Sequence, residues 1–328
     1  MASTLSVAVH SSQLPETVQR ELIDGLRHRR VAPKFHYQSY IQSQKWITLH
    51  NAWAPSQKDA DCAGAYDRAF EKVLELLLPR RLQVIGLGCG AGEKEARLLA
   101  LLAQHGKALS YNPCDVSLPL LLTATEEAQR AVPNMPHTPL MCDMAMADDL
   151  PTVFYELQDK PGRLITFFGM IPNFEPNEIM PRLAALVRPG DLLLFSANLA
   201  PGPDYDTGVR QILPGYDNPE TRDWLLTFLF DIGVEPADGA LEISVEDSGQ
   251  FKRVVADFHF KRDRDLTVYG EHIEFREGES LRLFFSYRYT PEKIGLLLNA
   301  HKLEVAGQWI SKSEEEGVFL CRLMPEES

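Results

Sequence analysis

Apolar positions are spaced in two different ways along the chain, and the change comes near residue 200. Up to that point, short apolar runs alternate with segments in which apolar residues recur every three or four positions. The runs predict buried parallel strands, and the recurring pattern predicts amphipathic helices between them. Strands are expected at 82–87, 108–116, 138–142, 163–168 and 192–197. This alternation predicts an α/β fold, an open and mostly parallel sheet with helices on both faces.

After residue 200 the pattern becomes that of antiparallel strands. Segments 241–246, 251–260, 265–275 and 280–290 alternate apolar and polar positions. Helices are expected at 224–232 and 291–301, and closing strands at 303–309 and 317–323. This part is therefore predicted to be a smaller α+β unit packed on the sheet.

The segment before the sheet is rich in aromatic residues. A helix is expected at 15–30, and the following stretch, 31–58, contains Phe35, His36, Tyr37, Tyr40, Trp46, His50 and Trp53. These rings fit either a helix pair that packs on the core or a cap over a ligand pocket. The chain is thus predicted to have three parts: a helical, aromatic cap at 1–60, the sheet domain at 61–200 and the α+β unit at 201–328.

A glycine-rich turn follows the first core strand, with Gly86, Gly88, Gly90 and Gly92 in alternate positions, and a helix begins directly after it. Glycine lets the backbone approach a ligand closely, and the first turn of a helix offers free N–H groups. This spacing alone leaves three readings open, namely dinucleotide binding, S-adenosylmethionine (SAM) binding and a purely structural turn.

Two acids stand at the ends of the next strands. Asp115 follows Gly88 by 27 positions, where a carboxylate can accept hydrogen bonds from ribose hydroxyls. The alternative is that Asp115 only caps the helix expected at 118–132. Asp143 ends the third strand, where it fits either an adenine amino group or a plain surface position. Because ligands of open α/β sheets lie at the carboxyl ends of the strands, we expect both acids near one pocket.

Composition excludes several classes of function. The net charge is −13, and no basic run would follow phosphates, so neither nucleic acid nor an anionic membrane is an expected partner. No apolar stretch is long enough to span a bilayer, and residues 1–16 lack the features of a secretory signal. The five cysteines form no CxxC pair, which argues against a structural metal site and favours reduced thiols in the cytoplasm. No Ser/His/Asp or Cys/His arrangement indicates hydrolysis.

Six segments, taken in order, resemble the SAM-dependent Nα-methyltransferases of the histidine-specific (ergothioneine-pathway) family. They are Gly-Leu-Gly-Cys-Gly-Ala-Gly-Glu-Lys (86–94), Tyr-Asn-Pro-Cys-Asp-Val-Ser (111–117), Phe-Phe-Gly-Met-Ile-Pro-Asn-Phe (167–174), Pro-Gly-Asp-Leu-Leu-Leu (189–194), Gly-Tyr-Asp-Asn-Pro (215–219) and Gly-Glu-Ser-Leu-Arg-Leu-Phe-Phe-Ser-Tyr-Arg-Tyr (278–289). The resemblance implies a Rossmann-like SAM methyltransferase sheet with a smaller α+β substrate-binding unit.

The resemblance also implies roles for individual residues. It places Gly88 and Gly90 against the cofactor, Asp115 on its ribose, Asp143 near its adenine and Gly169 beside its methionine part. For the substrate, it implies that Asn173 and Tyr216 hold the carboxylate of an amino acid. It further implies that an N-terminal tyrosine, Tyr37 or Tyr40, lies near the amine and takes a catalytic role.

The chain departs from the family pattern at three places. Gly86 stands where the family commonly has an acid, and Pro172 stands where it has a glycine in a segment one residue longer. Phe284, two residues before Ser286, takes the place of a glutamate that reads an imidazole ring. An apolar ring cannot pair with imidazole, and an unmatched polar group costs about 1–3 kcal/mol.

These observations predict a SAM-dependent N-methyltransferase of a small amino-acid-like molecule other than histidine, with Phe284 and Ser286 lining the side-chain pocket. A sulfonium cofactor needs little acid–base help from the protein, so the lack of an acid–base dyad is no objection. The alternatives are a non-catalytic protein that binds SAM or a partner, and an NAD-type oxidoreductase that uses the same glycine turn. No metal is expected, and the oligomeric state is left open.

Overall fold

An eight-stranded sheet forms the centre of the protein in the computed structural model, which describes residues 4–154 and 162–325. Its strands, in spatial order, are β1 (Ala8–Val9), β4 (Leu140–Met141), β3 (Ala108–Asp115), β2 (Arg81–Leu87), β5 (Gly162–Phe167), β6 (Leu192–Asn198), β13 (Glu316–Leu323) and β12 (Leu303–Ile310). The first six run parallel, whereas β13 is antiparallel to β6 and β12 is antiparallel to β13. The predicted α/β fold is therefore confirmed.

Helices cover both faces of this sheet because its central strands are apolar on both sides. On β2, Leu82 and Val84 pack in one core, while Ile85 and Leu87 pack in another. The first core contains α4 (Ala60–Leu76) and α5 (Glu93–Gln104). The second contains α7 (Leu150–Val153), α8 (Pro176–Leu186) and α11 (Pro291–Ala300). The helix α6 (Leu118–Ala131) follows β3 and packs on α5.

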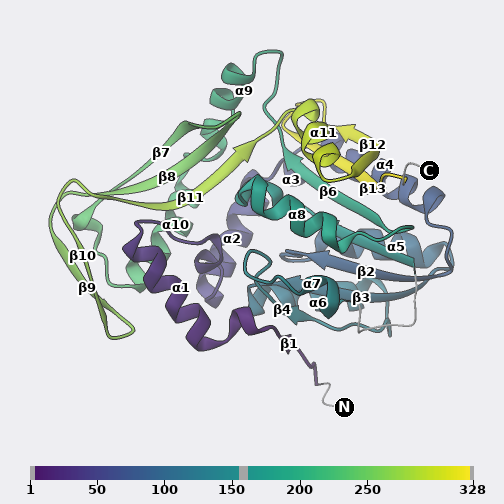
Figure 1. Cartoon of the computed structure of the whole chain (residues 1–328), viewed down its shortest axis with the longest axis horizontal. Helices are drawn as coiled ribbons and strands as arrows, with labels where there is room; N and C mark the ends of the chain where they lie inside the picture. Colours follow the sequence, from purple (N-terminus) through teal and green to yellow (C-terminus); the bar gives the residue numbers. More distant parts are fainter. Residues whose placement is uncertain (1–3, 155–161, 326–328) are drawn as a thin grey trace.

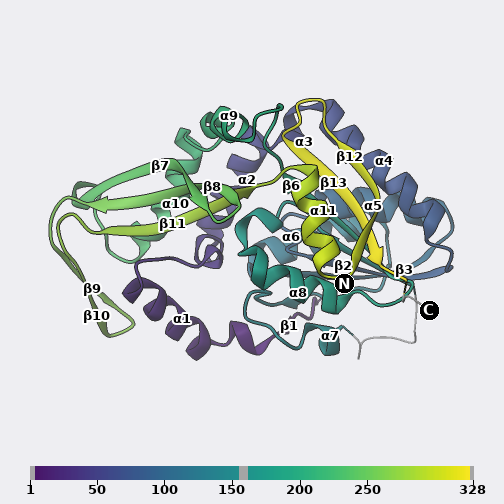
Figure 2. The same cartoon turned by 45° about the horizontal axis from the view of Figure 1, so that its top comes forward.

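A three-stranded antiparallel sheet lies beside the central sheet, with strand order β11 (Ser280–Arg288), β8 (Phe251–Phe260) and β7 (Gly239–Ser248) (Figures 1 and 2). Its core also contains α10 (Pro219–Asp231) and, from the other end of the chain, α1 (Pro15–Arg27). The N-terminal helix thus shares a hydrophobic core with the smaller unit, whereas the predicted division at residue 60 places it in a separate cap. The long strand β11 leads from this unit back to α11 on the central sheet.

The helix α2 (Tyr40–Trp53) packs against α10 and starts at a capping box made by Ser39 and Gln42. The remaining short elements are α3 (Pro55–Lys58), α9 (Tyr205–Gln211) and the 3-10 helices η1 (Ser11–Gln13), η2 (Pro33–His36), η3 (Ile171–Asn173), η4 (Leu213–Gly215) and η5 (Pro236–Asp238). Among the described residues, none of the helices combines the length and apolar character that crossing a membrane requires.

One predicted strand is wrong. The run at 265–275 is a hairpin, β9 (Arg264–Val268) and β10 (Glu271–Phe275), rather than a single strand. Tyr269 and Gly270 both have positive φ, which is the backbone that a two-residue hairpin turn needs. Tyr269 is of a residue type that favours strands, so the sequence pattern does not predict the turn.

Candidate functional site

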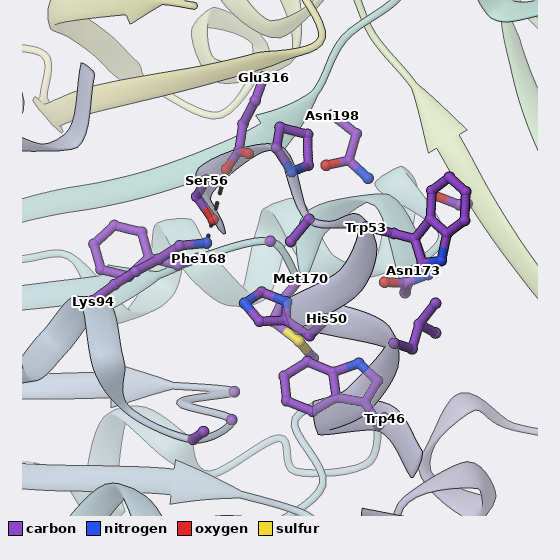
Figure 3. Close-up of a pocket in the computed structure, with 18 of the residues that line it drawn as sticks. Trp46, His50, Trp53, Ser56, Lys94, Phe168, Met170, Asn173, Asn198 and Glu316 are labelled. Carbon is purple, nitrogen blue, oxygen red and sulfur yellow. Dashed lines mark ion pairs between the residues drawn. The ribbon is translucent and has the colours of Figure 1, made fainter. Parts of the chain in front are cut away.

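A cavity of about 290 Å³ opens at the carboxyl ends of the parallel strands, between the central sheet and the smaller unit. Its wall combines the glycine turn after β2, the ends of β3, β5 and β6, and residues of α2, α10 and β11. Figure 3 shows the side formed by Trp46, His50 and Trp53 of α2. Nine of the residues that were given a specific role from the sequence line it, namely Tyr37, Gly88, Gly90, Asp115, Gly169, Asn173, Tyr216, Phe284 and Ser286. Two others, Tyr40 and Asp143, are not part of this wall.

The glycine turn needs its glycines for both conformation and space. Gly90 has φ 53°, and a Cβ atom there would lie 3.0 Å from the ring of Trp46. Gly92 has φ 79°, and a Cβ atom there would lie 2.6 Å from the Cα atom of Ala124 on α6. The turn therefore brings an open backbone to the cavity and lets α5 pack closely on α6, which fits a nucleoside-containing cofactor.

Asp115 is a buried carboxylate at the cavity edge. It accepts hydrogen bonds from the backbone N–H groups of Gly90 and Ser117, both at 2.9 Å. Burial raises the pKa of this carboxyl, and hydrogen bonds from the backbone N–H groups of Ser117, Gly90 and Val116 counteract that shift. The carboxylate thus ties the glycine turn to the end of β3, and with three backbone donors it keeps a lone pair for a ligand hydroxyl.

Asp143 lies outside the cavity and has a protein partner. Its carboxylate is 3.0 Å from the ammonium of Lys34, which also pairs with Glu21 on α1. The same carboxylate accepts a hydrogen bond from the backbone N–H of Ala145, at 2.8 Å. The structure therefore gives Asp143 a role in fixing the N-terminal segment and leaves it outside the wall of the cavity.

Charged residues line the end of the cavity near α5. The ammonium of Lys94 lies 3.8 Å from the carboxylate of Glu316 at the start of β13 (Figure 3). Glu316 also accepts hydrogen bonds from the hydroxyl of Tyr66 and the thiol of Cys62. Nearby, burial and then the charge of Lys94 lower the pKa of His50 to about 4, so that this ring is neutral.

A directed network of hydrogen bonds lies at the opposite end. The phenol oxygen of Tyr216 accepts hydrogen bonds from Arg288, at 2.7 Å, and from Asn198, at 3.1 Å. With both lone pairs occupied, this hydroxyl donates its own proton to the hydroxyl oxygen of Ser286, 2.8 Å away. The Ser286 hydroxyl is then left with a proton to donate. Asn173, which lines the same end, donates one amide proton to the backbone carbonyl of Phe285.

Aromatic rings form the wall between these two ends. Phe284 lies 6.1 Å from Tyr216 and 6.0 Å from Trp224, measured between ring centroids. Tyr37 contacts Trp224 and Trp46 at 5.3 and 5.9 Å. Burial raises the pKa of Tyr37, which keeps its phenol protonated. Tyr40, by contrast, is 68% exposed at the start of α2, so of the two predicted tyrosines the structure brings Tyr37 to the cavity wall.

Several residues of the cavity were given no role by the sequence reasoning, namely Lys94, Glu95, Asn198, Trp224, Arg288 and Glu316. A signal existed for some of them. Lys94 and Glu95 follow the glycine turn directly, and Arg288 follows Phe284 and Ser286 at the period of two that marks one face of a strand. For Glu316, which enters from the far end of the chain, the sequence carries no local signal.

Solved structures of similar shape are distant in sequence. They include the CcbJ methyltransferase from Streptomyces caelestis, which is 15% identical with a TM-score of 0.44, the alignment covering 90% of this chain and 100% of that one. Magnesium protoporphyrin IX methyltransferase from Synechocystis PCC 6803, with bound S-adenosylhomocysteine (SAH), is 14% identical with a TM-score of 0.47, covering 87% and 95%. A comparison with curated protein sequences gives no match.

The sequence itself matches a family model over nearly its whole length. The model describes histidine-specific, SAM-dependent methyltransferases and matches residues 19–323. This match confirms the resemblance seen in the six segments, and it selects SAM binding among the three readings of the glycine turn. The chain belongs to the histidine-specific, SAM-dependent methyltransferase family and is a methyltransferase with SAM as its cofactor.

Proposed function

We propose that this protein transfers the methyl group of SAM to the amino nitrogen of a small amino-acid-like substrate with an apolar side chain, and that histidine is not this substrate. The observation that carries the proposal is the position of Arg288. This guanidinium is 6% exposed, lines the cavity and forms no ion pair with any carboxylate in the described part of the chain. A buried guanidinium without an anion is matched by a carboxylate brought by the substrate.

The cofactor fits the end of the cavity near the glycine turn. We assign the ribose of SAM to Asp115 and its methionine part to the space beside Gly169. The backbone of Gly88 and Gly90 would contact the cofactor between them. The ammonium of Lys94, whose nearest carboxylate is 3.8 Å away, suits the carboxylate of that methionine part. When bound, SAM supplies an electrophilic methyl group on its sulfonium, so the protein's task is to align the acceptor amine and exclude water.

The substrate carboxylate fits the opposite end. The proton of the Ser286 hydroxyl and the second amide proton of Asn173 are the donors there, and Tyr216 fixes the Ser286 hydroxyl in the donating orientation. Arg288 supplies the positive charge behind Tyr216. This arrangement extends the roles that the resemblance implies for Asn173 and Tyr216.

The side chain of the substrate meets the ring of Phe284. This ring has no group that can pair with an imidazole N–H, so a histidine side chain would lose its hydrogen bonds to water without replacement. An apolar or aromatic side chain gains from the same surface through burial and ring contacts. The aromatic wall therefore favours a substrate of that kind.

The acceptor nitrogen has to be a neutral amine when it attacks. Tyr37 lies in the cavity wall, and its raised pKa leaves the phenol protonated, so it is no base for an ammonium group. Its hydroxyl oxygen can instead accept a hydrogen bond from the amine and thereby orient the nitrogen lone pair. Tyr37 is thus proposed as the group that positions the amine.

We further propose that the protein works on this metabolite in the cytoplasm. Its five cysteines are all free and buried, as expected for a protein of a reducing compartment. Together with the charge of −13, this argues for a small-molecule substrate over a nucleic acid.

The test is incubation with methyl-labelled SAM and a panel of free amino acids, their decarboxylated amines and their N-acetyl derivatives, read by mass spectrometry. We expect label on the amino nitrogen of an apolar or aromatic amino acid and none on the decarboxylated partner. Preferred labelling of histidine, or equal labelling of the decarboxylated amine, would contradict the proposal. Asn173→Ala should raise the KM of the preferred substrate, and unchanged KM and kcat would remove Asn173 from the site.

A further inference from the structure

Glu95 is a buried acid in the wall of the same cavity. It is 3% exposed and lies in the first turn of α5. Its carboxylate accepts a hydrogen bond from the hydroxyl of Thr166, at 3.2 Å, and from its own backbone N–H. The neighbouring ammonium of Lys94 has Glu316 as its ion-pair partner. Within residues 4–154 and 162–325, no Lys, Arg or His forms an ion pair with Glu95.

The groups that face Glu95 make its burial costly. They include Asp115 and Tyr111 on β3 and Cys89 in the glycine turn, none of which is a cation. The positive charge of Lys94, on the same helix, favours the ionised form of Glu95. Burial raises the pKa of the Glu95 carboxyl to about 7. A buried acid with so little compensation is destabilising for the free protein, and it is best explained by a cationic group that arrives with a ligand.

The neighbouring strand, β2, has no acidic residue that could take the role of Glu95. At Gly86 on β2, a Cβ atom would lie 2.9 Å from the hydroxyl oxygen of Tyr111, so that ring fills the position a longer side chain would need. The Tyr111 hydroxyl is itself buried and has no hydrogen-bond partner among the described residues. Two acids at the start of α5 line the cavity, and Glu95 is the buried one, whereas Glu93 is exposed and bonded to Gln57.

We propose that Glu95 binds the α-ammonium group of the cofactor's methionine part, while the adjacent Lys94 faces its α-carboxylate. The two side chains are consecutive at the start of one helix and carry opposite charges, as recognition of a zwitterion requires. Thr166 orients the carboxylate from β5, the strand that ends beside Gly169. This inference rests on the cofactor orientation proposed above.

Binding measurements on the purified protein test this role. Calorimetry compares SAH with 5′-methylthioadenosine, which lacks the amino-acid part. We expect Glu95→Gln to weaken SAH about 10-fold or more, as for loss of a charge-assisted hydrogen bond, and to change 5′-methylthioadenosine less than about twofold. Glu126→Gln is the control, because Glu126 is an exposed acid of α6 that does not line the cavity. Equal losses for both ligands, or none for SAH, would overturn the inference.

A second ligand and a second variant test the role of Glu95 separately from the cofactor orientation on which it rests. An SAH analogue without the α-amino group should bind wild type more weakly than SAH, and Glu95→Gln should bind the two about equally. If Asp115→Asn weakens SAH and Glu95→Gln does not, the role of Glu95 is wrong and the orientation stands. If neither variant affects SAH, the orientation itself is wrong. If Glu95→Gln lowers kcat at unchanged SAH affinity, Glu95 acts on the substrate amine and the inference fails.

Discussion

The guanidinium of Arg288 donates a hydrogen bond to the phenol oxygen of Tyr216 at 2.7 Å and lies 5.0 Å from the centre of that ring. Its second hydrogen bond goes to the backbone carbonyl of Leu199, and its Nε atom has no partner among the described residues. The positive charge is therefore held in place by neutral groups. An arrangement of this kind stabilises an incoming anion more than it stabilises the free protein.

Arg288→Gln should therefore impair substrate binding and leave cofactor binding intact. We expect the KM of the carboxylate substrate to rise about 10-fold or more, as for loss of a charged hydrogen-bond partner. Arg288→Lys should give a smaller rise, and Arg210→Gln, at an exposed position of α9, should have no effect. Initial-rate kinetics and SAH calorimetry provide the measurements. An equal loss of SAH affinity would mean that Arg288 supports the whole cavity.

Phe284→Glu tests the wall that excludes histidine. The ring is only partly buried, so the protein can accept a carboxylate there. We expect kcat/KM for the apolar substrate to fall about 10-fold or more and methylation of histidine to become measurable, because the new carboxylate can pair with imidazole. Phe284→Leu is the control and should keep the order of substrates. If histidine stays inert and the apolar substrate is unaffected, Phe284 does not contact the side chain.

Asp115 and Asp143 give a direct comparison between two acids that sequence alone treats alike. Asp115→Asn should weaken SAH about 10-fold, since a carboxylate that faces the cavity is lost. Asp143→Asn should leave SAH affinity unchanged and lower the free energy of unfolding by about 1–3 kcal/mol, because buried Lys34 loses one of its two carboxylates. Calorimetry and denaturant titration measure the two effects. A loss of SAH affinity in Asp143→Asn would return that residue to the cofactor site.

The contrast shows where sequence patterns stop being informative. Strand periodicity and the glycine turn predicted the end of the sheet at which the cavity lies. The alternation of strands and helices implies a parallel sheet, whose strands all end at the same edge. The partner of Asp143 comes from Lys34, more than 100 positions earlier, and no spacing rule encodes such a tertiary ion pair. In the same way, the periodicity of α1 shows an apolar face but not the smaller sheet on which that face packs.

Acid should destabilise the protein through its buried histidines. His36 lies between Trp224 and Phe228 and is hydrogen-bonded to the backbone carbonyl of Leu283. Burial lowers its pKa to about 4, below the unfolded value near 6.5, so this contribution is complete above pH 6.5 and is lost as the pH falls toward 4. The loss amounts to at most about 3 kcal/mol. Denaturant unfolding at several pH values should show a flatter acid limb for His36→Gln than for wild type, and equal slopes would contradict this account.

Glu95 should have the opposite effect, because its pKa is raised. Its carboxyl titrates near 7 in the folded protein and near 4.5 in the unfolded chain, so the free energy of unfolding falls as the pH rises between these values. At pH 8, Glu95→Gln should therefore be more stable than wild type without cofactor, by up to about 3 kcal/mol, and at pH 4 the two should agree. Saturating SAH should narrow the difference at pH 8, since the ligand's ammonium compensates the wild-type charge. Greater stability of wild type at pH 8 without ligand would show that Glu95 serves the fold and not the cofactor.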